Sequence, residues 1–267
     1  MTDASKPIVI KVGGRFFDEL LSATNATNAH PLLNAIKALK SAGRRVVLVH
    51  GGGNHVQTQL KALGFVSDKL DGLRITPDTH MPTVAGMLAG FLNKSLVAKS
   101  QALHINGVGM SLADGLLAKC EAINPALGAV GAPKENDASL IQILLDANML
   151  PIIASIGADS HGKLYNVNAD HAATCIARLI DAQLILLSDV TGVLDDKMEK
   201  IDRLTPAHAQ QLISDEVITD GMIVKVQAAQ DSADALNSAV VIGSWNEAQA
   251  LLDDKQSFGT QIMPKPN

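Results

Sequence analysis

Two lysines stand beside glycine-marked turns near opposite ends of this 267-residue sequence. Lys11 precedes Gly13 and Gly14, and Lys225 follows Gly221 at the start of a predicted helix. A transferring phosphoryl group spreads its charge over three oxygens, and proteins stabilise it with positioned cations rather than by covalent chemistry. The two lysines therefore predict a charge clamp for a phosphoryl group, provided that the fold brings them together.

Glycine clusters follow the first two predicted strands, at residues 7–12 and 45–50. The clusters are Gly13-Gly14 and Gly51-Gly52-Gly53. Glycine has no Cβ and tolerates positive φ, so backbone N–H groups beside it can approach an anion closely. Tight turns alone would explain either cluster, but two clusters after adjacent strands favour an anion cradle. The sequence lacks both common phosphate-binding signatures, G-x-x-x-x-G-K-[ST] and a complete G-x-G-x-x-G, so the ligand of the cradle stays open at this point.

Polar residues also follow two later predicted strands. Asn166, Asn168 and Asp170 alternate where a strand leads into a helix, and capping accounts for only one or two of them. A carboxylate between two lysines can fix their ammonium groups and keep them charged, which makes Asp170 a candidate partner for both. Ser188 and Asp189 follow the most apolar late strand, at the edge where open α/β sheets bind ligands. An ordinary strand-to-helix loop is the alternative there.

An esterase is the rival interpretation of two of these motifs. His50-Gly51-Gly52-Gly53 resembles an oxyanion-hole turn, and residues 109–113 are one residue short of a nucleophile elbow around Ser111. Asp189 and His208 would have to complete a catalytic triad. This interpretation requires a sharp strand-to-helix turn at Ser111, where the sequence instead predicts a hairpin, and it leaves both lysines unexplained.

The elements that must position these residues form a repeated strand–helix pattern. Hydrophobic residues make up 47% of the chain and aromatic residues only 3%, which predicts a core of Ala, Val, Ile and Leu with buried parallel strands covered by helices. We expect an α/β fold with a mainly parallel sheet. Predicted strands lie at residues 7–12, 45–50, 151–156, 184–188 and 239–243; predicted helices lie at residues 30–42, 54–63 (capped by Asn54), 79–102, 138–148, from about 169, 206–214 and 222–235; and predicted hairpins lie at residues 66–76, 107–123 and around 160–162.

Composition and charge exclude several classes of function. The formal net charge is −5, and no cluster of Lys and Arg with interleaved aromatic residues predicts a nucleic-acid surface. No stretch approaches the ~18 apolar residues of a membrane helix, and residues 1–6 lack a signal-peptide pattern. Cys120 and Cys175 are too few and too far apart for a metal or redox motif, and we expect buried free thiols. These features predict a soluble, cytoplasmic protein.

Six motifs taken together resemble the acetylglutamate kinases of the amino acid kinase family, and the match spans nearly the whole chain. The motifs are Lys11-Val12-Gly13-Gly14, His50-Gly51-Gly52-Gly53, Gly72-Leu73-Arg74-Ile75-Thr76, Asn166-Val167-Asn168-Ala169-Asp170, Ser188-Asp189-Val190-Thr191-Gly192 and Gly221-Met222-Ile223-Val224-Lys225. Their order and spacing are more specific than any one motif. The resemblance implies a three-layer αβα sandwich with an open, mainly parallel sheet and two lobes. Residues 1–157 would bind the amino-acid substrate and form the dimer, and residues 158–267 would bind ATP.

The resemblance also implies a reaction and its catalytic residues. The reaction is ATP-dependent phosphorylation of the side-chain carboxylate of N-acetyl-L-glutamate, to N-acetyl-L-glutamyl 5-phosphate and ADP, in arginine biosynthesis. By similarity, Lys11 and Lys225 stabilise the transferring phosphoryl group and the leaving phosphate, and Asp170 aligns both lysines. The amides of Gly14 and Gly52 would neutralise equatorial oxygens. A carboxylate nucleophile is already ionised at neutral pH, so Asp170 would be an organiser rather than a base.

Ligand contacts follow from the same resemblance. Arg74 is expected to clamp the substrate α-carboxylate, with Asn166, Gly51 and Gly52 around the rest of the amino acid. The residues expected at the adenosine are Asp189, Val190, Thr191, Gly192, Val193, Leu194, Val217, Ile218 and Thr219. Mg²⁺ is expected on the ATP phosphates rather than on protein ligands. The chain is expected to form a homodimer.

Other members of the family leave alternatives open. A kinase for N-acetyl-aminoadipate would share these motifs. A non-catalytic sensor of an amino acid or nucleotide would share the fold, although it would not need the clamp of Lys11, Asp170 and Lys225. Arginine-inhibited members carry an extra N-terminal helix, whereas only residues 1–6 precede the first strand here, so the sequence predicts insensitivity to arginine.

Overall fold

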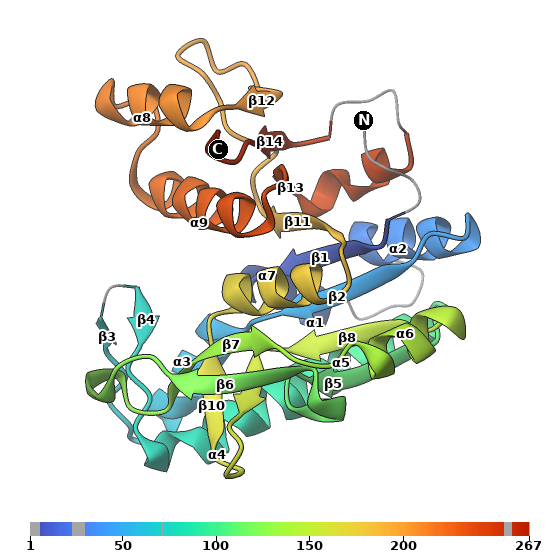
Figure 1. The fold of residues 1–267 in the computed structure, drawn as a ribbon, viewed down its shortest axis with the longest axis vertical. Coiled ribbons are helices and arrows are strands. Elements are labelled where there is room, and N and C mark those ends of the chain that lie inside the picture. Colours follow the sequence, from blue (N-terminus) through green and yellow to red (C-terminus); the bar gives the residue numbers. More distant parts are fainter. Residues whose placement is uncertain (1–5, 23–29, 71, 254–257, 267) are drawn as a thin grey trace.

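An eight-stranded sheet runs through the computed structural model, which describes residues 6–22, 30–70, 72–253 and 258–266 (Figure 1). Its strand order is β12-β14-β13-β11-β1-β2-β8-β5, and all neighbouring strands are parallel except β13 and β14. The strands are β1 (Ile8–Val12), β2 (Val46–His50), β5 (Gly107–Ser111), β8 (Leu150–Ala154), β11 (Gln183–Ser188), β12 (Arg203–Leu204), β13 (Val240–Ser244) and β14 (Thr260–Ile262). The predicted open, mainly parallel sheet is confirmed.

The central strands are apolar because both faces of the sheet are covered. All five residues of β2 are buried, and in β1 only Lys11 is partly exposed. A parallel sheet between two helical layers requires such continuous apolar runs. Lys11 is therefore an exception within the most buried part of the sheet, which points to a function for its side chain.

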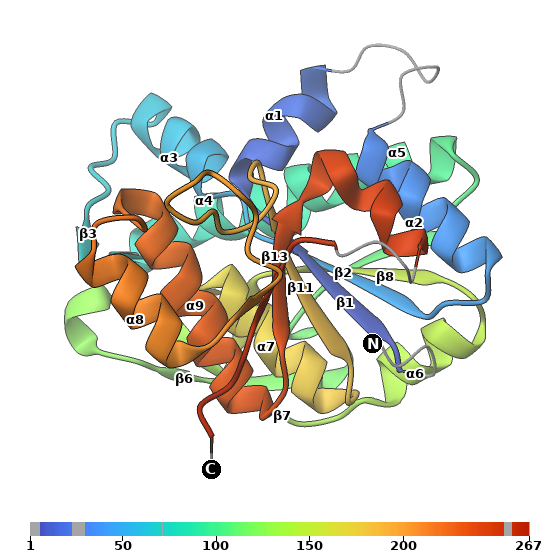
Figure 2. The same cartoon turned by 90° about the horizontal axis from the view of Figure 1, so that it is seen from above.

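Helices cover the two faces of the sheet, which confirms the three-layer αβα sandwich (Figure 2). One face carries α2 (Pro31–Ser41), α5 (Asn93–Ala102) and a 3₁₀ helix at Trp245–Leu252. The other face carries α7 (Ala169–Leu179) and α9 (Asp220–Leu236). The further α-helices are α1 (Gly14–Ser22), α3 (Gly53–Ala62), α4 (Met81–Ala85), α6 (Ser139–Asp146) and α8 (Pro206–Ser214). The first residue of α3 follows the N-cap Gly52, so Asn54 is not the cap that the sequence predicts.

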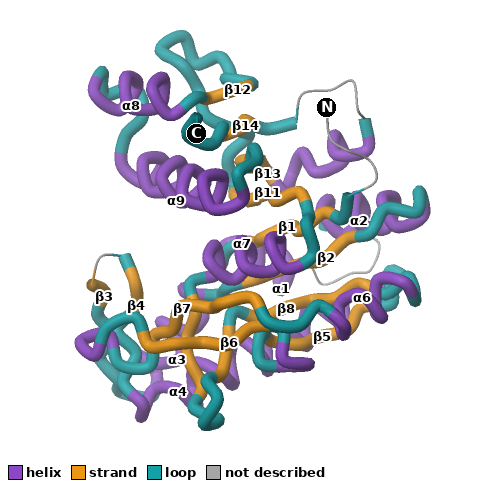
Figure 3. The backbone as a smooth tube through the Cα atoms, in the orientation of Figure 1, coloured by secondary structure: helices purple, strands orange, loops and turns teal. Residues whose placement is uncertain are grey.

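A second, four-stranded sheet packs beside α7 in the order β10-β7-β6-β9 (Figure 3), and it closes on itself because β9 pairs with both β6 and β10. Its strands are β6 (Ala118–Ala122), β7 (Val130–Glu135), β9 (Ile156–Ala158) and β10 (Leu164–Val167). The turn between β9 and β10 confirms the hairpin predicted around residues 160–162. A short hairpin of β3 (Lys69–Leu70) and β4 (Leu73–Arg74) confirms the one predicted at residues 66–76, whose Asp71 lies outside the described residues.

The hairpin predicted at residues 107–123 is wrong, because its two strands belong to different sheets. β5 pairs with β8 at the edge of the main sheet, whereas β6 pairs with β7 in the small sheet. The turn between them explains the difference. The Asp114 carboxylate accepts hydrogen bonds from the backbone N–H and the hydroxyl of Ser111, at 2.6 and 2.8 Å, and Gly115 adopts a left-handed φ of 60°. This 3₁₀ turn directs the chain away from the edge of the main sheet.

The long helix predicted at residues 79–102 is present but is not uniformly α-helical. It passes from a 3₁₀ turn (Asp78–His80) through α4 and a π-helical segment (Gly86–Leu92) into α5. No helix among the described ranges is long and apolar enough to cross a bilayer. Cys120 and Cys175 are both buried and free, as the sequence predicts.

The main sheet is continuous across the predicted lobe boundary. β1 lies between β2 and β11, so strands of both halves of the chain share one hydrogen-bonded sheet. Residue 157 falls inside β9, and β10 completes the small sheet with strands from the N-terminal half. The division into residues 1–157 and 158–267 stays a prediction.

Candidate active site

Lys11 and Asp170 form an ion pair at the carboxyl end of β1. The distance between Lys11 Nζ and Asp170 Oδ1 is 2.8 Å, and their side chains are only 16% and 23% exposed. Asn168 is the N-cap of α7, and its side chain accepts hydrogen bonds from the backbone N–H groups of Asp170 and His171. This cap fixes the first turn of α7, where the partial positive charge of the helix end also favours a carboxylate. The predicted contact between Asp170 and Lys11 is confirmed.

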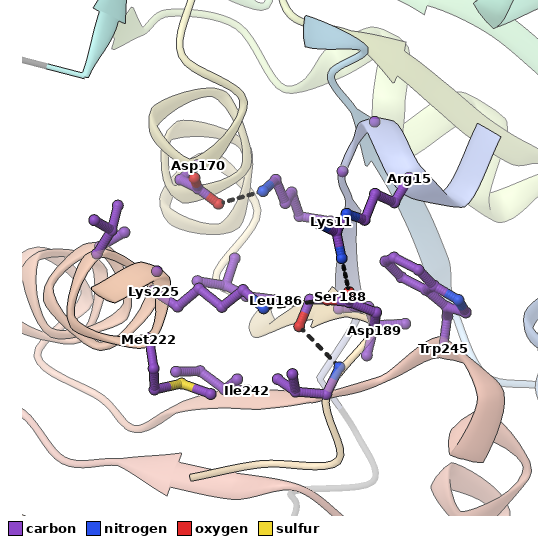
Figure 4. A pocket seen from close by; sticks show the side chains of 17 residues that line it. Lys11, Arg15, Asp170, Leu186, Ser188, Asp189, Met222, Lys225, Ile242 and Trp245 are labelled. Carbon is purple, nitrogen blue, oxygen red and sulfur yellow. Dashed lines mark hydrogen bonds and ion pairs between the residues drawn. The ribbon is translucent and has the colours of Figure 1, made fainter. Parts of the chain in front are cut away.

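Lys225 lies in α9 and pairs with a different carboxylate. Its Nζ is 3.2 Å from Asp189 Oδ1, while the Arg15 guanidinium donates to the other oxygen of Asp189 (Figure 4). Partial burial tends to raise the pKa of Asp189, but hydrogen bonds from Lys225 and Arg15 outweigh it and hold this pKa below its usual value. Asp170 contacts Lys11 and Asp189 contacts Lys225, so the alignment of both lysines by Asp170 stays a prediction. Asp170 packs with α7 against β1, whereas Asp189 follows β11 and faces α9.

A cavity of about 600 Å³ lies between these charges and an apolar wall (Figure 4). Its apolar wall is formed by Leu186, Leu187, Val190, Met222, Val224, Ala228, Ile242 and Trp245. Trp245 is buried and donates its indole N–H to the Glu19 carboxylate, which holds the ring in place. A volume of this size, with apolar walls and a few convergent charges, is typical of a site for a small organic ligand.

A second cavity, of about 370 Å³, is lined mainly by polar groups. Arg74 reaches it from β4 and donates hydrogen bonds to Gln57, to Ser67 and, at 2.9 Å, to the carbonyl oxygen of Gly53. Asn166 Nδ2 donates to Thr76 Oγ1 at 3.1 Å. The further lining residues include Gly51, Gly52, Asn54, Lys69, Ser155 and Asn168. This cavity brings together all four residues that the sequence predicts around an amino-acid substrate.

The two cavities share one group of residues. Lys11, Gly13, Gly14 and Asp170 line both of them. A group that is transferred from a ligand in one cavity to a ligand in the other would therefore pass the Lys11 ammonium. The predicted clamp of two lysines fits this arrangement, since Lys225 lines the larger cavity and Lys11 stands where the cavities meet.

The glycine turns after β1 and β2 pack closely where the cavities meet. A Cβ at Gly52 would overlap Leu92 Cδ1 and lie 3.0 Å from Leu88 Cδ2, and a Cβ at Gly51 would lie 3.0 Å from the Ala169 Cβ. A Cβ at Gly14 would lie 3.5 Å from the Gly53 nitrogen. A side chain at position 52 would therefore clash with the π-helical segment, which explains the glycine there.

The residues predicted around adenosine are only partly brought together. Asp189 and Val190 line the larger cavity. The others, which are Thr191, Gly192, Val193, Leu194, Val217, Ile218 and Thr219, are not part of its lining. The side chains of Val193 and Ile218 are buried in the core, so these two residues can present only backbone atoms to a ligand.

Arg15 and Trp245 are among the residues of the larger cavity that sequence reasoning missed. Arg15 is the second residue of α1, a helix that the sequence pattern does not predict. Trp245 follows the end of β13, and the rule that ligands bind beyond the carboxyl ends of parallel strands could have found it.

The geometry argues against an esterase. Ser111 ends β5 at one edge of the main sheet and hydrogen-bonds to Asp114, whereas Asp189 follows β11. Three strands lie between β5 and β11, which separates their ends by about 19 Å at about 4.8 Å for each strand spacing. The proposed triad is therefore not assembled.

Comparison with known proteins gives a consistent result. The model of the amino acid kinase family matches residues 6–244. The acetylglutamate kinase of Vibrio vulnificus (strain CMCP6) is 45% identical over 268 residues, which cover 99% of this chain and 100% of that protein. The crystal structure of smu.665 from Streptococcus mutans UA159 superposes with a TM-score of 0.77 at 28% identity, covering 96% of this chain and 98% of that one. The carbamate kinase from Giardia lamblia bound to AMP-PNP shares the fold, with a TM-score of 0.63 at 20% identity over 98% and 99% of the two chains.

Proposed function

The chain belongs to the amino acid kinase family, and we propose that it acts as an acetylglutamate kinase in arginine biosynthesis. It transfers the γ-phosphoryl group of ATP to the side-chain carboxylate of N-acetyl-L-glutamate, which gives N-acetyl-L-glutamyl 5-phosphate and ADP. The observation that carries this proposal is the junction of two cavities at Lys11, Gly14 and Asp170. The identity of 45% to an acetylglutamate kinase over nearly the full chain supports the choice of substrate.

Each cavity suits one substrate. The larger cavity, with its apolar wall and the Lys225 ammonium, takes ATP, and the smaller polar cavity takes N-acetyl-L-glutamate. Arg74 is held by Gln57, Ser67 and the Gly53 carbonyl group, and partial burial lowers its guanidinium pKa, although arginine stays charged. A preorganised, partly desolvated guanidinium is suited to bind the α-carboxylate through two hydrogen bonds. Asn166 lines the same cavity and contacts the rest of the amino acid.

The chemistry requires positioned charge rather than a base. The attacking carboxylate is already ionised at neutral pH, so no proton has to be removed. Lys11 stabilises the phosphoryl group where the cavities meet, and Lys225 stabilises the leaving phosphate from the side of the larger cavity. The backbone N–H groups of Gly14 and Gly52 donate to equatorial oxygens. Asp170 holds the Lys11 ammonium in place, and Asp189, which also accepts from Arg15, does so for the Lys225 ammonium.

Mg²⁺ is expected to arrive on the phosphates of ATP. No cluster of three or more His, Cys, Asp or Glu side chains that could hold a metal occurs within the described ranges, and the site carboxylates Asp170 and Asp189 each face cations. This donor set fits an ion that is carried mainly by phosphate and water oxygens, as is usual for Mg²⁺. When bound, the ion neutralises part of the phosphate charge.

We further propose a cytoplasmic homodimer with the two lobes predicted from the sequence. The helical run that contains the π-helical segment exposes 53% of Phe91, a large apolar side chain that a second copy of the chain would cover. Light scattering after gel filtration tests this arrangement, and a monomer at micromolar concentration would contradict it.

The decisive experiment mixes the purified protein with Mg-ATP and N-acetyl-L-glutamate and traps the acyl phosphate with hydroxylamine. We expect hydroxamate from N-acetyl-L-glutamate and its loss in Lys225→Ala, since a charge that acts on moving phosphoryl charge supports turnover rather than binding. Lys37→Ala, an exposed lysine of α2, is the matched control. Hydroxamate formed only from N-acetyl-aminoadipate would mean that this compound is the substrate. If neither amino acid gave hydroxamate, the result would favour a non-catalytic sensor.

A further inference from the structure

A fully buried histidine ends β2, directly before the glycine turn of the proposed site. His50 has no exposed surface and packs against the ring of Phe17, with the ring centroids 5.2 Å apart. Both of its ring nitrogens have partners. Nε2 lies 3.0 Å from Asn93 Nδ2, and Nδ1 lies 2.9 Å from the carbonyl oxygen of Gly51. No step of the proposed reaction uses this imidazole.

The contacts of Asn93 determine which ring nitrogen of His50 carries the proton. The Nδ2 atom of Asn93 lies 2.9 Å from the carbonyl oxygen of Ile152 and 3.4 Å from that of Met110. Carbonyl oxygens only accept, so this atom must be the amide NH₂ group. The Lys94 ammonium donates to Asn93 Oδ1 at 3.2 Å, which agrees with the same orientation. Asn93 therefore donates to His50 Nε2, and Nε2 must be unprotonated.

The single proton of the neutral imidazole then sits on Nδ1. From there it donates to the Gly51 carbonyl group. The alternative tautomer would place the Nδ1 lone pair against the lone pairs of that oxygen, and a buried pair of acceptors is costly. Burial lowers the pKa of His50 to about 4, so the ring stays neutral at physiological pH.

The hydrogen bond to Gly51 also fixes the direction of the next N–H group. The Gly51 carbonyl and the Gly52 N–H belong to one peptide group, and no cis peptide bond occurs within the described ranges. In a planar trans peptide these two groups point in opposite directions. When the carbonyl group is turned toward buried His50, the Gly52 N–H is turned away from it. Gly52 lines the smaller cavity, whereas buried His50 does not, so an N–H group turned away from His50 can face this cavity.

A hydrogen bond that orients this peptide is needed because glycines flank it on both sides. Glycine restricts φ and ψ least of all residues, so the Gly51–Gly52 peptide has little intrinsic preference for one orientation. We propose that His50, held in its Nδ1-protonated form by Asn93, is a positioning residue that aims the Gly52 N–H at the transferring phosphoryl group. The inference rests on the proposed function, because it assigns this N–H to an equatorial phosphoryl oxygen.

Two substitutions of His50 distinguish its hydrogen bond to Gly51 from a role in packing alone. In His50→Asn the side-chain amide nitrogen takes the position of Nδ1 and can donate to Gly51. In His50→Gln the amide lies near the position of Nε2, so the contact to Asn93 is kept and the bond to Gly51 is lost. Loss of an oxyanion donor costs about 10²–10³ in kcat, and a misdirected donor costs part of this. We expect kcat to fall about 10-fold or more in His50→Gln and less than about 3-fold in His50→Asn, with little change in either KM.

A structural role would give the opposite order, because glutamine is closer to histidine in volume. Urea unfolding and the folded fraction are measured for each variant, and kcat is expressed per folded molecule. His80→Gln, at a buried histidine on the 3₁₀ turn before α4, is the matched control and is expected to keep the wild-type kcat. Equal kcat values in the two His50 variants, or a more active His50→Gln, would overturn the proposal.

The tautomer is tested without any assay of activity. In protein labelled with ¹⁵N-histidine, couplings between ring nitrogens and ring protons identify the protonated nitrogen, and the signals of His50 are those absent from His50→Asn. We expect a protonated Nδ1 and an unprotonated Nε2 from about pH 8 to about pH 6. The other tautomer, or protonation within that range, would refute the positioning role even in an active enzyme. If the wild-type protein formed no hydroxamate, the proposed function would be refuted. The positioning role of His50 would then fail with it, whichever tautomer is observed.

Discussion

Lys11 and Lys225 each face a carboxylate, but the two ion pairs differ in one respect. Asp170 pairs with Lys11, whereas Asp189 is shared between Lys225 and Arg15. If Lys225 moves toward a phosphate, Asp189 keeps Arg15 as a partner and is not left as an uncompensated charge. Arg15 therefore makes it easier for Lys225 to leave its resting position.

Substitution of Arg15 tests this idea. In Arg15→Ala, Lys225 is the remaining partner of Asp189 and is held more firmly, so we expect kcat to fall about 2- to 5-fold, since exposed ion pairs are worth about 1 kcal/mol or less. Arg15→Lys should restore most of the loss. Steady-state kinetics at low ionic strength provide the measurement, and an Arg15→Lys variant as impaired as Arg15→Ala would contradict the charge argument.

Arg74 allows a prediction about substrate binding. Its removal should chiefly raise the KM for N-acetyl-L-glutamate, by about 10- to 100-fold, because hydrogen bonds to charged groups are worth about 1.5–3 kcal/mol. The KM for ATP should stay near the wild-type value. Arg74→Lys should recover little, since an ammonium cannot reproduce the fork of the guanidinium. A change confined to ATP would show that the two cavities have been assigned to the wrong substrates.

Among the contacts between individual side chains, the sequence predicted only some. Lys11 and Asp170 are next to strand and helix ends that are strongly marked in the sequence, so their contact could be anticipated. The partner of Lys225 could not, because it depends on how α9 packs over β11 and β13. Sequence spacing does not give the distance between residues 189 and 225.

At the scale of elements, the site is built from strand ends. β13, β11, β1 and β2 are four consecutive strands of the sheet, and each delivers site residues at its carboxyl end. Apolar runs followed by glycine or polar residues made the strands visible in the sequence. The edge strand β5 was assigned to a hairpin because the pattern of its residues cannot distinguish pairing with β8 from pairing with β6. Its partner is fixed by the tertiary fold, through the turn at Asp114 and Gly115.

The turn after β2 predicts a difference between two glycine substitutions. In Gly52→Ala the new methyl group would overlap Leu92 of the π-helical segment, so the turn or the helix must shift. We expect a loss of about 1–3 kcal/mol in the free energy of unfolding together with a large loss of kcat. In Gly13→Ala a Cβ meets nothing within 4 Å, so stability should change little.

Urea unfolding measures both variants. The double variant Gly52→Ala with Leu92→Ala provides the control, because it removes the overlapping methyl group. In the Leu92→Ala background, Gly52→Ala should lower the free energy of unfolding by less than it does in the wild type. Equal losses of unfolding free energy in the two backgrounds would mean that the overlap with Leu92 does not cause the destabilisation.

At the scale of the whole molecule, the continuous sheet joins the two proposed substrate sites. Lys11 in β1 stands between strands of the N-terminal half, which carry the smaller cavity, and β11 and β13, which carry much of the larger one. Composition and periodicity predicted a mainly parallel sheet covered by helices, and the family resemblance implied the three-layer sandwich. The sequence could not predict that β10 returns to the small sheet, because that pairing joins residues 166 and 130, which are distant in the chain.

Buried histidines give the whole molecule a predicted dependence of stability on pH. Burial lowers the pKa of His50 from 6.5 to about 4, and burial also lowers that of His30, opposed by Glu19. Because the unfolded chain binds these protons more readily, it carries more protons between about pH 6.5 and pH 4. The stabilisation from neutral His50 is therefore complete above about pH 6.5 and is lost as the pH falls toward 4, by about 3 kcal/mol in total.

Urea unfolding at several pH values between about 7.5 and 4.5 measures this loss. His50→Asn has no group that titrates at this position, so its free energy of unfolding should fall less steeply over the same range, whatever its value at neutral pH. The pKa of Asp189 is also lowered, but below the usual carboxyl value, so the stability that Asp189 contributes is lost at a lower pH than the stability from His50. The pH ranges of the two losses therefore differ. Parallel curves for the wild type and His50→Asn would mean that His50 does not resist protonation. A neutral His50 is the premise of its role at Gly51, so this experiment on the whole molecule also bears on the geometry of the turn.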